Sequence, residues 1–441
     1  MNLKELIDEG PVTGLQITVI MVCFILTMLD GFDVLAISFT APSISDEWDI
    51  KAGTLGIVFS AGLVGMMLGA MFIAPLFDIF GRRIMVLISL TVISIAMFFT
   101  GTVTSVWQLM VFRLIAGLGI GSMLAGLTSM AAEYSPVRQR NLAITFVSAG
   151  YPVGATLGGI ITAWIIPEYG WRTVFYAGGI LTAAMIPIVL LFLPESLYFL
   201  IDKQPRRALQ RMNKILLKLK QPELQEIPAV NTSEKQARAT VKSLLTTDRR
   251  SSTILLWLSF FMCFMTLYFL LSWIPKIVVD AGLPLEKGIY TSVAFNLGAI
   301  IGVVLLGYLS DKKGLRPLIF WFLVIGAVLM LAYGIAPTIV AILLVLYFLL
   351  GFFVDGGFAG LYAVAARIYP TEIRTTGIGW AIGAGRTGAI AGPVIGGLLI
   401  GMGLPIAITF MIFSVPLIIA AFATYAIKSP ELIVVHDSTS T

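Results

Sequence analysis

Two aspartates, Asp30 and Asp33, lie inside an apolar stretch that runs from about residue 15 to residue 41. Their i, i+3 spacing places both carboxyl groups on one face of a helix. Two like charges this close in a poorly solvated site cannot both ionise cheaply, so we expect one of them to hold a proton. Ionisable groups at membrane depth usually mark an ion or substrate path. We therefore predict that the pair carries protons; the alternative is that one aspartate only joins two helices by pairing with an arginine.

Two arginines, Arg113 and Arg386, also lie within apolar stretches. An arginine stays charged and can hold a carboxylate through two parallel hydrogen bonds. Counting 1.5 Å per residue places Arg113 and Asp33 at similar depths, about 10 and 12 Å from the same side, so the two are expected to meet. Arg386 lies about 15 Å from the opposite side, among small residues. We expect Arg386 to anchor an anionic substrate or to act in a gate, and Arg113 to partner the acids. The roles could be exchanged, and Arg386 could instead form a structural ion pair with Asp355.

Aromatic and amide side chains in the same kind of stretch could complete a substrate site. An aromatic substrate would stack on such rings, and an amide could donate a hydrogen bond to it. Any one ring could equally be a packing residue or an interfacial anchor. The predicted substrate-binding residues, besides the two arginines, are Tyr151, Tyr268, Asn296 and Trp380.

The composition requires a membrane protein. The 441 residues are 58% hydrophobic and only 12% charged, whereas a soluble chain carries about 25% charged residues. Apolar stretches of about 20 residues, enough to cross a bilayer as a helix, recur along the chain. We predict an all-α integral membrane protein with twelve transmembrane helices in two pseudo-symmetric six-helix bundles. The predicted spans are residues 15–41, 54–75, 84–101, 106–132, 141–166, 172–193, 253–279, 289–309, 317–336, 338–366, 376–401 and 404–427.

The distribution of positive charge predicts the topology. When the loops are assigned alternately to two sides, most of the 29 Lys and Arg residues fall on the side that holds both termini. Only Lys51, Arg172, Lys276 and Lys287 fall on the other side. By the positive-inside rule both termini are cytoplasmic. The net charge of +5 therefore reflects topology and predicts no nucleic-acid partner.

Few residues are suited to metal or enzyme chemistry. Cys23 and Cys263 lie in different spans and predict neither a disulfide nor a metal site. The single histidine, His436, lies in the polar tail, which excludes a histidine relay in the membrane. No phosphate-binding loop, dinucleotide fingerprint or nucleophile elbow is present. We expect neither an enzyme nor a bound cofactor, with the proton as the only coupling ion.

A repeat relates the two halves of the chain. Asp78 and Asp311 are 233 residues apart, and each is followed by Gly three residues later and by Arg five residues later. A second pair of anchors, Pro136 with Arg140 and Pro370 with Arg374, has almost the same offset. Parallel repeats of six helices predict two bundles that rock about a central site. The predicted domains are a bundle at 1–194, a cytoplasmic linker at 195–252, and a second bundle with a short tail at 253–441.

The linker contains a predicted amphipathic helix at residues 206–220. Leu209, Met212, Leu216 and Leu219 fall on one face, and basic residues surround the rest. Contact with the anionic inner leaflet is the plain explanation for such a helix, and a site for a regulatory partner is the alternative.

These motifs resemble those of the major facilitator superfamily. The resemblance covers nearly the whole chain and includes the two loops, Arg113 opening the segment that continues to Gly119, and Leu193-Pro194-Glu195-Ser196 closing the sixth span. The first loop departs from the family pattern at Ala74 and Ile79. It is therefore expected to form fewer charge contacts, unless the arginines at 82 and 83 compensate. The resemblance implies a cytoplasmic gate, whose predicted residues are Asp78, Arg82, Arg83, Glu133, Arg140, Asp311, Arg316, Asp355 and Arg374.

The Asp30-Gly31-Phe32-Asp33 sequence, with Ala41-Pro42 after it, resembles the first span of the aromatic acid/proton symporter branch. That branch imports benzoate-like and hydroxybenzoate-like carboxylates across the bacterial inner membrane. The resemblance implies a monomeric, proton-coupled importer of a small aromatic carboxylate that works by alternating access in membrane lipid. Alternatives are another organic anion, such as muconate or a nicotinate-like acid, a sugar or a drug; a more remote one is a membrane sensor that moves nothing.

Overall fold

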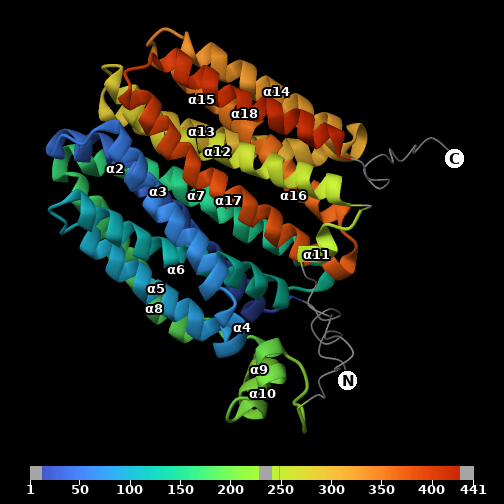
Figure 1. Cartoon of the computed structure of the whole chain (residues 1–441). Helices are drawn as coiled ribbons and strands as arrows, with labels where there is room; N and C mark the ends of the chain where they lie inside the picture. Colours follow the sequence, from blue (N-terminus) through green and yellow to red (C-terminus); the bar gives the residue numbers. More distant parts are fainter. Residues whose placement is uncertain (1–11, 228–240, 248, 428–441) are drawn as a thin grey trace. The chain divides into compact units, whose positions relative to one another are not determined.

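The computed structural model describes residues 12–227, 241–247 and 249–427, and every regular element within these ranges is helical (Figure 1). Eleven candidate spans among these residues are long and apolar enough to cross a membrane. The first repeat contributes α2 (Gly14–Trp48), α3 (Ala52–Leu68), α5 (Arg82–Thr100), α6 (Val106–Glu133), α7 (Val137–Tyr169) and α8 (Trp171–Phe192). The second contributes α12 (Arg250–Asp280), α13 (Leu285–Lys313), α14 (Leu315–Gly334), α15 (Val340–Leu350) with α16 (Gly356–Ile368), α17 (Thr371–Gly401) and α18 (Ile406–Ala426).

The predicted span at 376–401 forms part of α17, which is not among the eleven candidates. Its many glycines and its arginine lower its mean hydropathy relative to the other long helices. It nevertheless packs closely against α12.

The first predicted span was too short, because α2 continues through Pro42 to Trp48. A proline inside a membrane helix is tolerated when other groups satisfy the carbonyl that it leaves free.

The two repeated loops share an unusual backbone conformation. Gly81, between α4 (Leu76–Phe80) and α5, has φ +103°, and Gly314, between α13 and α14, has φ +78°. Glycine adopts positive φ without the steric cost that a Cβ imposes. The repeat predicted from the sequence is therefore present in the backbone geometry of both loops.

Glycines bring α7 into direct backbone contact with α2. A Cβ added to Gly154 would lie 1.8 Å from the carbonyl oxygen of Met28, and one added to Gly31 would lie 2.0 Å from that of Tyr151. Such distances leave no room for any side chain, so the two helices cross at van der Waals contact of their backbones. This crossing fixes the rotation of α2 and hence the direction in which its aspartates point.

The corresponding pair in the second repeat, α12 and α17, packs in the same way. A Cβ on Gly388 would lie 2.1 Å from the carbonyl oxygen of Phe261, and one on Gly392 would lie 2.2 Å from that of Met265. On Gly385 it would lie 2.3 Å from the ring of Phe264. Close contacts at glycines therefore also fix the position of α17 against α12.

The chain forms two compact units whose boundaries cut through three helices. Unit 1 comprises Met1–Ala36, Ala61–Gly158 and Tyr169–Glu234, and unit 2 comprises Ile37–Ser60, Gly159–Glu168 and Lys235–Thr441. We call the segments Ile37–Ser60 and Gly159–Glu168 the far ends of α2, α3 and α7. Within unit 2, these far ends pack against helices of the second repeat.

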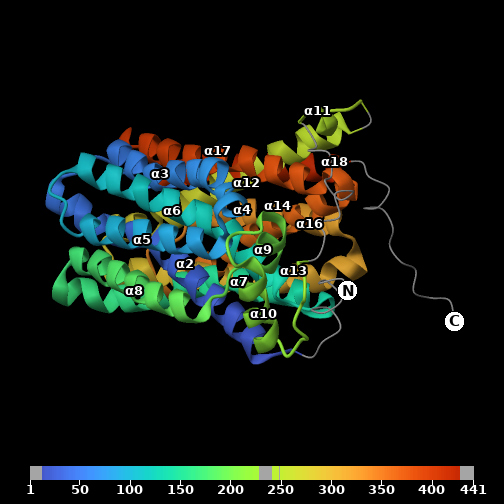
Figure 2. The same cartoon turned by 90° about the horizontal axis from the view of Figure 1, so that it is seen from below.

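The predicted helix of the central segment is present as α10 (Ala208–Lys218), beside α9 (Leu197–Lys203) (Figures 1 and 2). Met212, Leu216 and Leu219 of the predicted apolar face are buried, whereas Leu209 is half-buried. The apolar face is thus covered by protein, which differs from the lipid contact that we expected for it. The short α11 (Val241–Leu244) precedes α12.

Candidate functional site

The acid pair is buried in α2. Asp30 is 2% exposed and Asp33 is 0% exposed. Gly31, between them, lies against the backbone of Tyr151, so the α2–α7 crossing holds this turn of α2 rigidly. Tyr151 itself is half-buried on α7. The structure therefore places the predicted Tyr151 next to the acid-bearing turn.

Asp33 lies among α5, α6 and α8. A Cβ on Gly178 of α8 would come within 3.3 Å of Asp33 Oδ1 and within 2.8 Å of the Met97 side chain. Both carboxyl oxygens of Asp33, and Oδ2 of Asp30, are buried and have no hydrogen-bond partner among the described residues. An ionised carboxylate is costly in such surroundings, so the arrangement suits a protonated acid.

Arg113 meets Asp33 as predicted, but through the backbone. Its Nη2 donates to the backbone carbonyl of Asp33 at 2.7 Å, and its Nη1 lies 3.1 Å from the sulfur of Met97. Its Cζ lies 5.8 Å from the centre of the Phe175 ring. Arg113 is 3% exposed. The arginine is therefore held beside the acid without a hydrogen bond to its carboxyl oxygens.

Arg386 of α17 lies over an aromatic surface in unit 2. Its guanidinium carbon is 5.7 Å from the centre of the Phe264 ring, and its Nη1 donates to Tyr268 Oη at 3.4 Å. Arg386 is half-buried, whereas Tyr268 is 8% exposed. The predicted pair Arg386 and Tyr268 is thus brought together.

Two rings of α16, Phe358 and Tyr362, belong to this aromatic surface and were not predicted from the sequence. Phe264 and Tyr268 stack at 5.8 Å, and Phe358 of α16 meets Phe264 edge-on at 4.6 Å. Tyr362, one turn after Phe358, meets Phe260 edge-on at 5.2 Å. The i, i+4 spacing of aromatic residues on both helices was the signal that could have identified this surface.

Asp355 lies at the end of a π-helical turn, Gly351–Asp355, between α15 and α16. It is half-buried. Tyr362 of α16 lies within electrostatic range of Asp355, Arg386 and Tyr268. Because π-helical turns often occur at functional sites, Asp355 belongs with the surroundings of Arg386 as much as with the predicted gate.

The other two predicted binding residues contact other protein groups. Asn296 Nδ2 donates to the backbone carbonyl of Ser292, one turn earlier in α13, at 2.8 Å. Trp380 stacks on Trp257 with ring centres 6.0 Å apart and remains 46% exposed. The Asn296 contact lies within α13, whereas the Trp380 contact joins α17 to α12.

Three predicted gate residues of the first repeat, Asp78, Arg82 and Glu133, form a charge network. Arg82 is 3.1 Å from Asp78 and 2.9 Å from Glu133. Arg82 Nη1 also donates to Ser196 Oγ at 2.7 Å, and Ser196 in turn donates to Glu133. Arg82 therefore compensates for the departures of this loop from the family pattern.

Glu195 and Ser196 belong to this network, although the prediction named neither as a gate residue. Glu195 Oε1 accepts from the backbone N–H groups of Arg83 and Ser196, at 3.1 and 2.9 Å. The Leu193–Ser196 motif was the available signal, but nothing local in it indicates which loop it contacts. Burial explains its tight bonding, because Glu195 is 9% exposed and Ser196 is 0% exposed.

The two repeats use one arginine in the same way. Arg83 donates to the backbone carbonyl of Leu190 near the end of α8, and Arg316 donates to that of Tyr425 near the end of α18. In the second repeat, Leu315 occupies the position of Arg82. The side chain of Asp311 lies outside the described part of the structure. The second repeat therefore has no arginine at the position on which the charge network of the first repeat is centred.

Arg140 and Arg374 are also equivalent. Arg140 Nε donates to the backbone carbonyl of Ala132 at 3.0 Å, and Arg374 Nε donates to that of Tyr369 at 3.3 Å. Each arginine therefore stabilises the turn that joins two long helices of its repeat.

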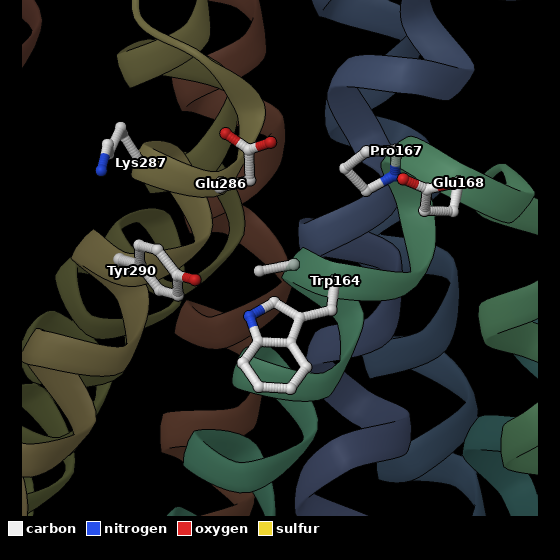
Figure 3. A pocket seen from close by; sticks show the side chains of 7 residues that line it. Trp164, Pro167, Glu168, Glu286, Lys287 and Tyr290 are labelled. Carbon is white, nitrogen blue, oxygen red and sulfur yellow. The ribbon is translucent and has the colours of Figure 1, made fainter.

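An open pocket of about 540 Å³ lies between α7 and α13 in unit 2 (Figure 3). Trp164 and Tyr290 face it from the two helices, and Glu286 points toward it. It contains none of the predicted site residues. Within the described residues, no group of three or more His, Cys, Asp or Glu side chains is arranged to hold a metal ion.

Comparison with known proteins gives a consistent result. Residues 23–332 and 284–437 match the Major Facilitator Superfamily. The chain is 32% identical to a gallate transporter of Pseudomonas putida, over 97% of this chain and 95% of that protein. It is 31% identical to the 4-hydroxybenzoate transporter PcaK of Acinetobacter baylyi, over 100% of this chain and 96% of that protein.

Solved structures share the fold at lower identity. The D-xylose-proton symporter superimposes with a TM-score of 0.72 at 19% identity, covering 95% of this chain and 98% of its own. A bacterial homologue of the lysosomal transporter Spinster, in an inward-facing and occupied conformation, gives a TM-score of 0.73 at 16% identity, with 92% and 95% coverage.

Proposed function

The chain belongs to the Major Facilitator Superfamily of transporters, and from this premise we propose that it imports a small aromatic carboxylate together with protons. The observation that carries the proposal is the Asp33 carboxyl group. It is fully buried in a membrane helix, has no hydrogen-bond partner among the described residues, and lies beside Arg113. A buried acid with an arginine held ready beside it can take up a proton and release it when its surroundings change.

The substrate class follows from Arg386 and the rings around it. A guanidinium group binds a carboxylate through two hydrogen bonds, and the rings of Phe264 and Tyr268 offer stacking surfaces for an aromatic ring. The names of two relatives, a gallate transporter and a 4-hydroxybenzoate transporter, support the same class. We assign Arg386 as the anchor of the substrate carboxylate.

Proton coupling offsets the electrical free-energy cost of moving an anion into the cell. Bringing one negative charge into a cell that is negative inside costs about 2.3 kcal/mol per 100 mV. One co-transported proton makes the entry of a monoanion electroneutral, and a second makes it electrogenic. Asp30 and Asp33 supply two carboxyl groups within one helical turn, enough for either stoichiometry.

Alternating access provides the transport cycle in this proposal. The acid pair takes up a proton from outside, Arg386 binds the substrate carboxylate, and occupation of both sites lets the six-helix repeats rock. The protein acts as a monomer in the lipid of the bacterial inner membrane, with both termini in the cytoplasm. The far ends of α2, α3 and α7 then face the outside.

The test is uptake of radiolabelled 4-hydroxybenzoate into proteoliposomes with an imposed inside-alkaline pH gradient. We expect accumulation that a protonophore abolishes and that unlabelled gallate or benzoate inhibits. Arg386→Gln should abolish uptake. Arg211→Gln, which removes an exposed arginine of α10, is the matched control and should transport normally.

Two outcomes would contradict the proposal. Accumulation that persists with the protonophore would exclude proton coupling. Inhibition by muconate or xylose, but not by benzoate, would assign a different substrate class.

A further inference from the structure

Ser38 joins the two repeats at the far end of α2. Its hydroxyl lies 2.7 Å from the backbone carbonyl oxygen of Leu271 and 2.8 Å from that of Ser272, both in α12. Ser38 is 1% exposed. All three residues belong to unit 2, so the contact is internal to that unit. A helix of the first repeat is thereby bound to a helix of the second.

The carbonyl of Leu271 needs a donor from outside its own helix. In an α-helix it would accept from the N–H four residues later, but that residue is Pro275, which has no N–H. A backbone carbonyl without a donor is costly in the membrane interior. The Ser38 hydroxyl supplies the donor that α12 cannot supply.

The sequence repeat explains why α2 supplies the donor of this bond and α12 supplies the acceptor. Ser38 and Leu271 are 233 residues apart, the offset that also relates Asp78 to Asp311 and Pro42 to Pro275. The first helix of each repeat therefore has a proline that frees the carbonyl four residues before it. Only the first repeat has a hydroxyl at the equivalent position, because Leu271 cannot donate from its side chain.

Neighbouring contacts close the same end of the molecule. Ser60 Oγ of α3 donates to the backbone carbonyl of Ile390 in α17 at 2.7 Å. A Cβ on Gly56 would lie 2.5 Å from the backbone oxygen of Pro393. Phe59 packs edge-on against Trp273, with ring centres 5.2 Å apart. The far ends of α2 and α3 are thus sealed onto α12 and α17.

We propose that Ser38 is the latch of this closed end. By donating to the carbonyl that Pro275 leaves free, its hydroxyl stabilises the state in which the far ends are closed. When that side opens, α2 separates from α12 and water replaces Ser38 as the donor. Ser38 is thus a positioning residue that sets the balance between transport states. The proposal rests on the alternating-access cycle proposed above.

A cysteine reporter measures this balance. Val293→Cys provides one, because Val293 is 8% exposed and packs against Gly159 at the far end of α7. The native Cys23 and Cys263 are 0% exposed and should remain unlabelled. The experiment measures the rate at which a membrane-impermeant maleimide labels this cysteine from outside, in intact cells without substrate.

We expect Ser38→Ala to raise the labelling rate about threefold, the value of one interhelical hydrogen bond in a membrane. The matched control is Thr266→Val. Thr266 is 0% exposed, and its hydroxyl donates to the backbone carbonyl of Phe413 at 2.9 Å, but both residues belong to the second repeat. Opening of the far end leaves that bond intact, so the control should label at the parental rate.

Equal rates in Ser38→Ala and the parent would overturn the latch. An equal increase in Thr266→Val would also overturn it, by showing general loosening. A second readout is transport: Ser38→Ala should lower the KM for uptake from outside without raising the maximal rate, because more molecules start in the state open to that side. A further measurement separates the two proposals. If 4-hydroxybenzoate and a pH gradient do not change the labelling rate of the parent protein, the result contradicts alternating access rather than the role of Ser38.

Discussion

Arg113 contacts Asp33 through the backbone carbonyl at 2.7 Å, while both carboxyl oxygens of Asp33 remain without a hydrogen-bond partner among the described residues. The arginine is therefore already positioned beside the acid but is not bound to its carboxyl group. In the proposed transport cycle, release of a proton from Asp33 creates a negative charge beside Arg113 and so favours an ion pair between the two side chains.

Asp33→Asn tests this arrangement. Asparagine resembles the protonated acid in shape and cannot release a proton. We expect folding stability to change by less than about 1 kcal/mol, because no hydrogen bond to the carboxyl oxygens is lost. Proton-driven accumulation of substrate should disappear, while exchange of substrate across the membrane persists. Thermal unfolding and counterflow measurements check the two parts, and normal accumulation would show that Asp33 is not the coupling acid.

Gly388→Ala tests the packing of α17 on α12. The added methyl group would lie 2.1 Å from the backbone oxygen of Phe261, so the helices must separate. We expect a loss of about 1–3 kcal/mol in the free energy of unfolding, together with impaired transport. Gly383→Ala in the same helix is the control, because a Cβ there meets nothing within 4 Å. It should stabilise α17 by about 0.5–1 kcal/mol; similar effects of the two changes would contradict the packing argument.

Arg386→Lys tests the mode of anion binding. Lysine keeps the charge but lacks the planar pair of donors. We expect the KM for an aromatic carboxylate to rise about tenfold, which corresponds to about 1.4 kcal/mol. Tyr268→Phe keeps the stacking surface and removes only the hydroxyl that contacts Arg386, so its effect should be smaller. Initial uptake rates over a range of substrate concentrations give the KM of each variant. A larger rise in KM for Tyr268→Phe than for Arg386→Lys would mean that the Tyr268 hydroxyl, rather than Arg386, is the main contact of the substrate.

The Arg82–Glu133 pair should show measurable coupling. A double-mutant cycle with Arg82→Gln and Glu133→Gln is expected to give an interaction free energy of about 1 kcal/mol or more, since the two side chains are only 13% and 12% exposed. The control cycle uses Lys276 and Asp280, a more exposed pair within one helix, where coupling should be close to zero. Unfolding midpoints of all variants supply the values. Equal coupling in both cycles would mean that burial does not strengthen the gate network.

The long apolar helices, the two repeats, the buried acids and the positions of the two intramembrane arginines could all be predicted from the sequence. These features depend on local composition, on spacing along one helix or on a fixed offset, and all three can be read from a linear chain. Gly81 and Gly314, both at positive φ, show how directly the repeat carries over into the backbone.

Which groups meet could not be predicted in the same way, because it depends on the packing of distant segments. The backbone contact of Arg113, the rings of Phe358 and Tyr362 near Arg386, and the bond from Ser38 to Leu271 all depend on how helices cross and rotate against one another. Those crossings are set by glycines whose partners lie far away in the sequence, such as Gly154 with Met28. Hydropathy places a residue in the membrane, but backbone contact between distant segments determines which partner its side chain reaches.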